Sequence, residues 1–258
     1  MLNVAIVIAI TNQKGGVGKT TTAVNLAYSL AKNGKKILLV DFDPQGNATS
    51  GLGIDKQGIN LNMSDVILNR APLSAVIQKT KHKNLDIAPT ISTLANTEVE
   101  LANADKRFVR LKNAIELNEG DYDIVIIDCP PSLSLLTVNG LIAAQYILLP
   151  VQAEFYALEG LGQLLETVKL IRKATNPTLE LLGVLPTMMD SRTTLSGQVH
   201  DEIKKHFPGK VFETTIPRNI RLAEAPSHGL PVGAYDKFSK GARAYRALAK
   251  EVMKRVEK

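Results

Sequence analysis

Residues 13–22 read Gln13-Lys14-Gly15-Gly16-Val17-Gly18-Lys19-Thr20-Thr21-Thr22. They follow an apolar run from Val4 to Ile10 and precede a helical pattern that starts at Ala23. Glycines let backbone N–H groups converge on phosphate oxygens, and the N-terminus of the next helix adds the positive end of its dipole. The stretch therefore predicts a strand, a glycine loop and a helix that together cradle phosphate groups.

Two side chains of this stretch have specific roles in such a cradle. Lys19 neutralises charge on the β- and γ-phosphates, and Thr20 presents a hydroxyl to Mg²⁺. We expect the loop to bind ATP through Lys14, Gly15, Gly16, Val17, Gly18, Lys19, Thr20 and Thr21.

The spacing departs from the strict P-loop pattern G-x-x-x-x-G-K-[ST] at its first position, where this chain has Gln13. It matches the variant K-G-G-x-x-K-T, in which Lys14 is an additional lysine. Because Lys19 already serves the cradle, we interpret Lys14 as a residue that reaches phosphate across a subunit interface. The alternative is a solvated lysine on a glycine loop.

Length and charge limit the other possibilities. The 258 residues are predicted to form a single P-loop ATPase domain, 1–258, without a second domain. Residues 185–258 contain 14 Lys and Arg against 8 Asp and Glu, whereas residues 1–184 contain 17 of each. This excess suggests a polyanionic partner or an acidic membrane surface, with simple solubility as the alternative.

Three further features bear on localisation and metal binding, and the apolar run near the N-terminus points to a cytoplasmic protein. The single cysteine, Cys129, has no partner for an internal disulfide and is predicted to be a small buried hydrophobe. The apolar run near the N-terminus is too short for a membrane span and lacks the basic residues of a signal peptide. The four histidines are scattered without ligand spacing, so we propose no structural zinc.

Apolar patterns alternate between strands and helices along the chain. Strands are predicted at residues 4–10, 36–40, 85–88, 122–128, 146–151, 181–186 and 211–214. Helices are predicted from Ala23 and at residues 63–68, 73–78, 106–117, 135–144, 156–174, 194–206 and 240–256. This order predicts an α/β fold, with a mostly parallel sheet covered by helices on both faces.

Carboxylates at strand ends complete the predicted site. Asp128 ends an apolar strand where a P-loop enzyme needs an acid for Mg²⁺, although a turn cap is the alternative. Asp43 lies in the loop after another strand, and we assign it to orienting the attacking water. Asp41 competes for that role, but Asp43 lies further out of the strand.

Four spaced blocks of sequence resemble the ParA/Soj partitioning ATPases, which have a deviant Walker A P-loop and belong to the MinD/ParA superfamily. The blocks are Lys14–Thr20, Val40–Asn47, Ile127–Leu133 and Pro217–Gly229, the last preceded by Met189–Thr193. The resemblance implies an ATP-dependent homodimer in which Lys14 reaches the partner's nucleotide and Lys19, Asp43 and Asp128 serve hydrolysis. It also implies non-specific binding of double-stranded DNA, release by a ParB-type partner, and a nucleoid-associated ATP state.

The resemblance further implies roles for residues beyond the loop. Pro217 and Asn219 correspond to the segment that lines the purine. DNA contact is carried over to Arg192, Arg218, Arg221, Lys237, Lys240 and Arg243.

Two related functions remain open on the sequence. Plasmid relatives often carry an N-terminal DNA-binding extension, whereas here the cradle starts at residue 14, so the short chromosomal type fits better. A MinD-like protein that binds membranes would need a bulky apolar stripe on its C-terminal helix. Ala247, Leu248, Val252 and Val256 make a modest stripe of the kind that usually packs in a core, so no stable membrane association is expected. A ParA-like ATPase that positions another cargo is the second alternative.

Overall fold

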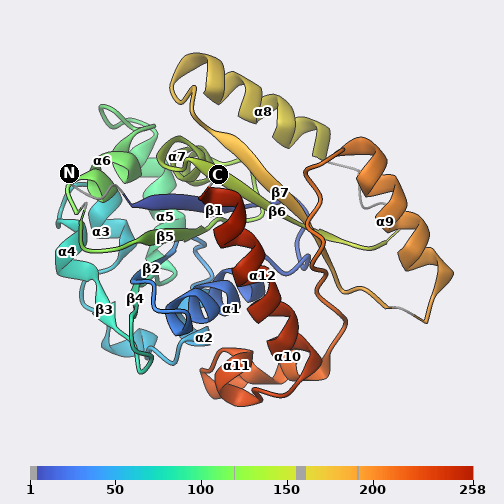
Figure 1. The fold of residues 1–258 in the computed structure, drawn as a ribbon. Helices are drawn as coiled ribbons and strands as arrows, with labels where there is room; N and C mark the ends of the chain where they lie inside the picture. The colour runs from blue at the N-terminus through green and yellow to red at the C-terminus, as the bar shows by residue number, and fades with distance from the viewer. Residues whose placement is uncertain (1–4, 119, 155–160, 191, 258) are drawn as a thin grey trace.

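A seven-stranded sheet in the order β3-β4-β2-β5-β1-β6-β7 runs through the computed structural model (Figure 1). The structure describes residues 5–118, 120–154, 161–190 and 192–257. Neighbouring strands pair in parallel, except that β3 is antiparallel to β4. The strands are β1 (Ile6–Ile10), β2 (Ile37–Asp41), β3 (Gln78–Lys79), β4 (Leu85–Ala88), β5 (Ile124–Asp128), β6 (Tyr146–Gln152) and β7 (Glu180–Thr187). The predicted mostly parallel α/β fold is therefore confirmed.

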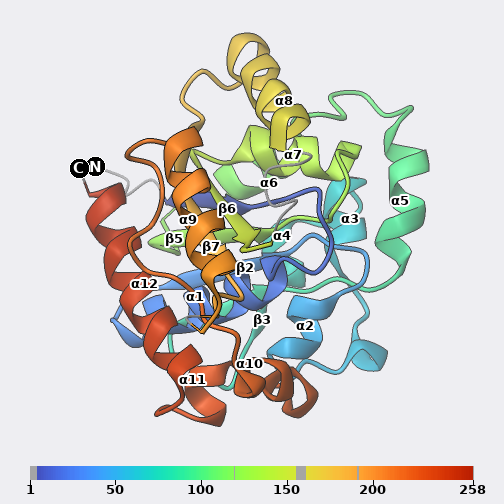
Figure 2. The same cartoon turned by 90° about the vertical axis from the view of Figure 1, so that its right-hand side faces the viewer.

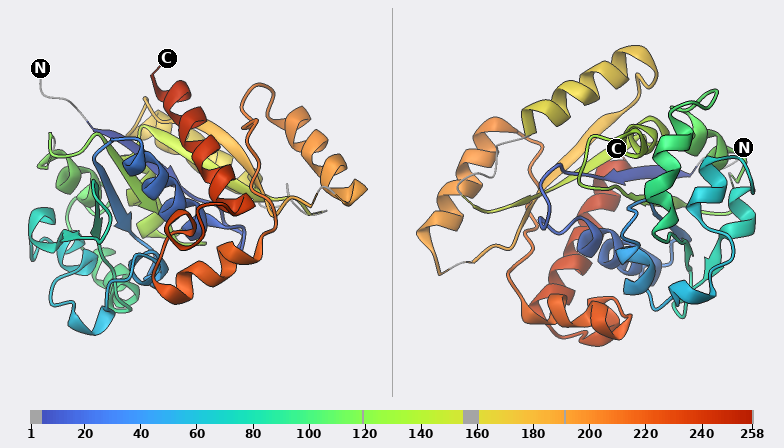
Figure 3. Two further views of the ribbon diagram at one scale, coloured as in Figure 1. Left: turned by 60° about the horizontal axis from the view of Figure 1, so that its bottom comes forward. Right: turned by 180° about the vertical axis from the view of Figure 1, so that it is seen from behind.

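Helices cover both faces of this sheet, as the turned view shows (Figure 2). The α-helices are α1 (Lys19–Lys32), α2 (Asn47–Gly51), α3 (Met63–Ile67), α4 (Leu73–Val76), α5 (Thr93–Leu101), α6 (Arg110–Glu116), α7 (Leu135–Ala143), α8 (Leu161–Ala174), α9 (Thr194–His206), α10 (Ile220–Glu224), α11 (Val232–Tyr235) and α12 (Lys240–Val256), with 3₁₀ turns η1 (Lys56–Gly58) and η2 (Ala225–His228). One core lies under α1 and α12, and a second under α3 to α9. Helix α9 lies beyond the β7 edge, away from α3 to α6 (Figure 3).

The register of the central strands brings three strand ends to one edge. Each residue of β2 and β5 is buried, because helices cover these strands on both sides. Asp128 at the end of β5 pairs with Ile10 of β1 on one side and with Asp41 of β2 on the other. The phosphate loop that follows β1 therefore starts beside two buried carboxylates.

The first helix begins earlier than the pattern from Ala23 indicates. Helix α1 starts at Lys19, and Gly18 precedes it with a φ of 89° that favours glycine. The helix starts at the glycine loop because the Thr22 amide donates to the Gly18 carbonyl at 2.9 Å, which makes the first helical hydrogen bond. Its apolar pattern becomes continuous only where the helix enters the core.

The predicted strand at residues 211–214 is wrong. This segment runs beside β7 but forms only an isolated bridge between Val184 and Val211. The amides of Glu213 and Thr214 donate instead to the Glu251 carboxylate on α12, each at 2.9 Å, so they cannot join a strand ladder. The first part of the helix predicted at 156–174 lies outside the described residues; the described part is α8.

Helix α12 matches the predicted bounds, and its apolar face packs in the core. Ser239 caps it by accepting a hydrogen bond from the Ala242 amide at 3.1 Å. Leu248 and Val252 are fully buried in the core that includes α1. Of the stripe considered as a membrane anchor, Leu248 and Val252 are thus used in packing, while Val256 is half-buried and Ala247 is exposed. Within the described part of the chain, no helix combines the length and apolar character needed to cross a bilayer.

Candidate functional site

The glycine loop is held open by backbone geometry and by hydrogen bonds to residues at neighbouring strand ends. Gly16 and Gly18 have φ values of 75° and 89°, which glycine adopts readily. The Thr187 hydroxyl at the end of β7 donates to the Val17 carbonyl at 2.8 Å, and the Lys14 amide donates to Asn12 Oδ1 at 3.0 Å. The loop is therefore shaped before any phosphate binds.

Lys19 lies inside this loop. Its side chain is buried, and Nζ donates to the Lys14 carbonyl at 3.2 Å, so the ammonium sits within the curve of the loop. Burial lowers the pKa of Lys19, while the carboxylates of Asp128 and Asp43 oppose that change. A cation placed here fits the β- and γ-phosphates of a nucleotide.

Asp128 is a buried carboxylate without a strong partner. Neither carboxylate oxygen accepts a well-formed hydrogen bond from the described residues. Burial raises the pKa of Asp128 well above its ordinary value, the charge of Asp41 adds to the rise, and the nearby Thr20 hydroxyl opposes it. An unsatisfied carboxylate beside a hydroxyl fits Mg²⁺, which binds through one or two protein oxygens together with phosphates and water.

Asp41 and Asp43 differ in their hydrogen bonds. Asp41 Oδ2 accepts from the amide and the hydroxyl of Thr49, at 2.7 and 2.6 Å, and burial raises the pKa of Asp41 to about 6. Asp41 thus fixes the start of α2 to the end of β2. Asp43 accepts from the Gln45 amide at 2.9 Å and is close enough to Lys19 to raise its pKa. This arrangement favours Asp43 over Asp41 as the carboxylate available to water.

Lys14 does not point freely into solvent. Its side chain is 39% exposed, and Nζ forms an ion pair with Glu154 Oε2 at 3.4 Å. Gln152, the last residue of β6, also donates to the Glu154 carboxylate. In the single chain the lysine predicted to cross a subunit interface is therefore paired within its own subunit.

A cavity of about 430 Å³ adjoins the loop. Gly18 and Thr21 line it on the loop side, and Pro217 and Asn219 line it on the other. Asn219 Oδ1 is buried without a partner among the described residues, as expected of an amide kept for a ligand. The structure thus places the two residues predicted to bind the purine within reach of the loop.

Several more cavity residues escaped the sequence analysis. Tyr245 of α12 and Leu222 of α10 are two that line the wall, and Met188 follows β7 with a φ of 52°. Met188 directly follows a strand end, which is the position where ligands bind in open α/β sheets. Its position could therefore have identified Met188 from the sequence, whereas Tyr245 and Leu222 reach the cavity only through tertiary packing.

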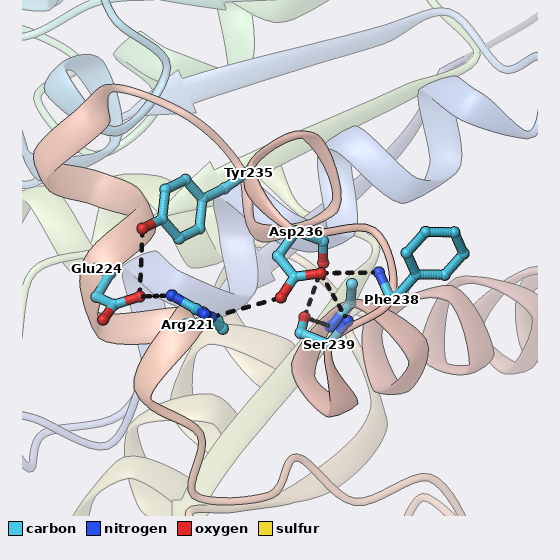
Figure 4. A network of polar contacts seen from close by, with 7 residues as sticks. Arg221, Glu224, Tyr235, Asp236, Phe238 and Ser239 are labelled. Atoms are coloured by element: carbon cyan, nitrogen blue, oxygen red, sulfur yellow. Dashed lines mark hydrogen bonds and ion pairs between the residues drawn. The ribbon is translucent and has the colours of Figure 1, made fainter.

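Two of the predicted DNA-contact residues are engaged by carboxylates. Arg192 pairs with Asp190 at 2.7 Å. Arg221 pairs with Glu224 at 2.8 Å and with Asp236 at 3.5 Å (Figure 4). These ion pairs partly neutralise both cations.

The other four cations form no ion pair with a described residue. Arg218 lines the cavity and is exposed, while Lys240 and Arg243 are exposed in the first turn of α12. Lys237 lies just before that turn, with Nζ 4.9 Å from the centroid of the Phe238 ring. The unpaired charge is thus gathered near the N-terminal end of α12.

Comparison with known proteins shows the family of the chain. The family model described as an AAA domain matches residues 5–181. The chain is 55% identical to sporulation initiation inhibitor protein Soj of Bacillus subtilis, covering 95% of this chain and 97% of that protein. It is 49% identical to chromosome partitioning protein ParA of Myxococcus xanthus, covering 96% and 88%.

A similar solved structure contains a bound nucleotide. Cobyrinic acid a,c-diamide synthase from Mycobacterium smegmatis, with a bound ATP analogue and magnesium, has a TM-score of 0.87 and 38% identity, covering 98% of this chain and 96% of that one. The partitioning relatives carry more weight for function because their identity is higher. With such relatives along nearly its whole length, the chain belongs to the Soj/ParA family of chromosome-partitioning ATPases.

Proposed function

We propose that the protein is an ATP-dependent switch for moving DNA. In the ATP state two subunits enclose two nucleotides and bind duplex DNA without sequence preference, and a ParB-type partner stimulates hydrolysis and release. The names of the relatives support a role in partitioning, and the phosphate loop supports nucleotide binding.

We assign phosphate binding, water orientation and magnesium binding to different residues of the site. Lys19 holds phosphate charge in the loop, and Asp43 accepts a hydrogen bond from the attacking water and turns it toward the γ-phosphate. Thr20 and Asp128 would hold Mg²⁺, which supplies charge neutralisation between the phosphates. Lys14 would exchange Glu154 for the nucleotide of the second subunit.

One observation links the nucleotide to the four exposed cations without an ion pair among the described residues, which we call the basic surface: Arg218, Lys237, Lys240 and Arg243. The cavity beside the loop is walled by residues 216–219, and Arg218 belongs both to that wall and to the exposed cations. A purine in the cavity therefore contacts the segment that carries part of the proposed DNA surface. Dimerisation would then double the cations presented to one duplex.

The test is affinity for a duplex of unrelated sequence, measured across a salt series with ATP and with ADP. We expect tighter binding with ATP and a steeper slope, because the logarithm of the affinity falls by about 0.9 per phosphate contacted for each decade of salt. Duplexes of different sequence should bind alike, since interactions with phosphate carry no base information.

Two variants separate the steps. Lys14→Ala should stay monomeric with ATP and bind DNA weakly, while Asp43→Ala should form a lasting dimer that keeps DNA bound. Sedimentation with ATP reports the dimer. Equal DNA binding with ATP and ADP would reject the switch, and ATP-dependent binding to anionic vesicles instead of DNA would favour a membrane-positioning ATPase.

A further inference from the structure

Phe238 is a large apolar side chain displayed on the basic surface. It is 74% exposed and follows Lys237 in the turn between α11 and α12. Lys240 and Arg243 follow it within the first turn of α12, and both are exposed. Figure 4 shows the ring pointing away from the polar network beneath it.

The turn that carries Phe238 is fixed by hydrogen bonds. The amides of Phe238 and Ser239 both donate to Asp236 Oδ1, at 3.0 and 3.1 Å. Arg221 holds the other oxygen of Asp236 at 3.5 Å, and Tyr235 donates to Glu224, which also binds Arg221 (Figure 4). The ring is therefore presented by a preorganised backbone, which lowers the entropic cost of binding a partner.

The surroundings of the ring indicate which partner it fits. Among the described residues from 216 onward, Ile220 and Phe238 are the large apolar side chains that remain mostly exposed, at 69% and 74%. Two separate side chains are too few for an interfacial helix, because the apolar face of α12 is buried in the core. A ring among cations instead fits a polyanion that also offers apolar surface, as a duplex does in its sugars and base edges.

We infer that Phe238 contacts duplex DNA directly, with its ring against sugars or base edges of the minor groove, while Lys237, Lys240 and Arg243 hold the phosphates on either side. This inference rests on the proposed DNA binding and adds an apolar interaction that salt does not screen. Proteins that bind the minor groove frequently place apolar side chains in it, often inserted between base steps.

The apolar interaction has a signature that separates it from the cations. Phe238→Ala should weaken binding of the ATP-loaded protein to a random duplex at least about tenfold, which is the low end of the value of burying an aromatic ring. The slope of log affinity against log salt should stay unchanged. Lys240→Ala should flatten that slope by about 0.9, because one lysine neutralises one phosphate. Phe238→Leu should recover most of the affinity.

The controls use the protein with ATP and magnesium throughout. Leu170→Ala removes a comparably exposed apolar side chain from α8 and should leave DNA binding unchanged. Thermal unfolding and sedimentation of Phe238→Ala should match the parent protein. If the parent protein binds no DNA with ATP, the proposed function itself fails.

Other results overturn the inference alone. If the parent binds DNA and Phe238→Ala binds equally well, the ring does not touch the duplex. A change in salt slope would assign the weaker binding to displaced cations. Failure of Phe238→Ala to form the ATP-dependent dimer would place the ring against the second subunit.

Discussion

The phosphate loop and the basic region from α10 to α12 differ in how their side chains are held. In the loop, Lys19 is buried and fixed by a carbonyl of the same loop, 3.2 Å away. In the basic region, Arg221 is held by Glu224 and Asp236, whereas Lys240 and Arg243 make no ion pair with a described residue. Adjacent cations of the basic region are therefore unequal, although their charges are the same.

The difference shows which cations have a role that the sequence alone predicts. A glycine loop between a strand and a helix dictates its own geometry, so the role of Lys19 follows from its neighbours in the chain. The role of a surface arginine depends on which carboxylate folding brings near it. Substitutions should therefore have their largest effects in the phosphate loop and smaller effects at the surface cations.

Lys19→Ala should have the largest effect. Removing a buried cation from the loop leaves phosphate charge unneutralised, and we expect ATP affinity to fall about a hundredfold, the value of a hydrogen bond between charged groups. Titration with a fluorescent ATP analogue measures it, and Lys32→Ala in the last turn of α1 is the matched control. Near-parental affinity in Lys19→Ala would contradict the phosphate loop.

Asp128→Asn should abolish Mg²⁺-dependent hydrolysis while stabilising the nucleotide-free protein. Its raised pKa means that the folded state disfavours the charged carboxylate, so the stability it contributes is present at low pH and lost as pH rises through the folded pKa. The neutral amide removes that cost at pH 8. Each kcal/mol regained should raise the melting temperature by about 2–4 °C.

The sign of this effect provides its own control. The gain in Asp128→Asn should shrink as pH falls toward the ordinary range of a carboxyl group, where the parent is protonated too. Thermal scans from pH 5 to pH 8 without nucleotide measure the trend. A melting temperature that falls on substitution at pH 8 would show that the carboxylate stabilises the site.

The helices and strands show how much of the fold the sequence predicts. Helices α9 and α12 and strand β4 have the predicted bounds, because their patterns are local and strongly periodic. Helix α5 was missed because it buries only Leu94, Thr97 and Leu101 in nine residues. The segment at 211–214 has a strand-like pattern, but Glu251 takes its amides, and nothing near it in the sequence announces that carboxylate.

The same limit applies to the site. The loop residues, Asp43 and Asp128 could be proposed from the sequence because each adjoins a strand end, and the hydrogen bonds from Thr49 to Asp41 favour Asp43 as the residue that orients water. Tyr245 joins the cavity beside the loop from a helix more than two hundred residues after the loop. Glu154 was missed because an acid two residues beyond a strand is ordinary until Lys14 is seen beside it.

The cations should differ by moderate amounts. Lys240→Glu or Arg243→Glu should weaken DNA binding about tenfold and flatten its salt dependence, because each removes an unpaired charge. Arg221→Glu should instead lower the melting temperature, since it leaves Glu224 and Asp236 facing a third carboxylate. Duplex affinity and thermal unfolding of the three variants decide it. If all three variants behaved alike in both assays, paired and unpaired cations would not differ in function.

The smallest effect should come from Glu154→Gln, which tests the ion pair between Lys14 and Glu154, a partly exposed pair like those of the basic region. Lys14 and Glu154 are 39% and 47% exposed, and ion pairs of that exposure contribute about 0.2–1 kcal/mol. If Lys14 must leave Glu154 to reach a second subunit, weakening that pair should tighten ATP-dependent dimerisation by up to about fivefold for each of the two subunits, because each breaks one pair.

Glutamine keeps the size and the polarity of the side chain, so packing is unchanged and the charge alone is removed. Sedimentation equilibrium with ATP measures the dimer, and Glu202→Gln on α9, which unpairs an exposed lysine elsewhere, is the control. A weaker dimer in Glu154→Gln would mean that Glu154 supports the interface. Lys14 would then be held in place for its partner, because its own ion pair would be part of the dimer and would not compete with it.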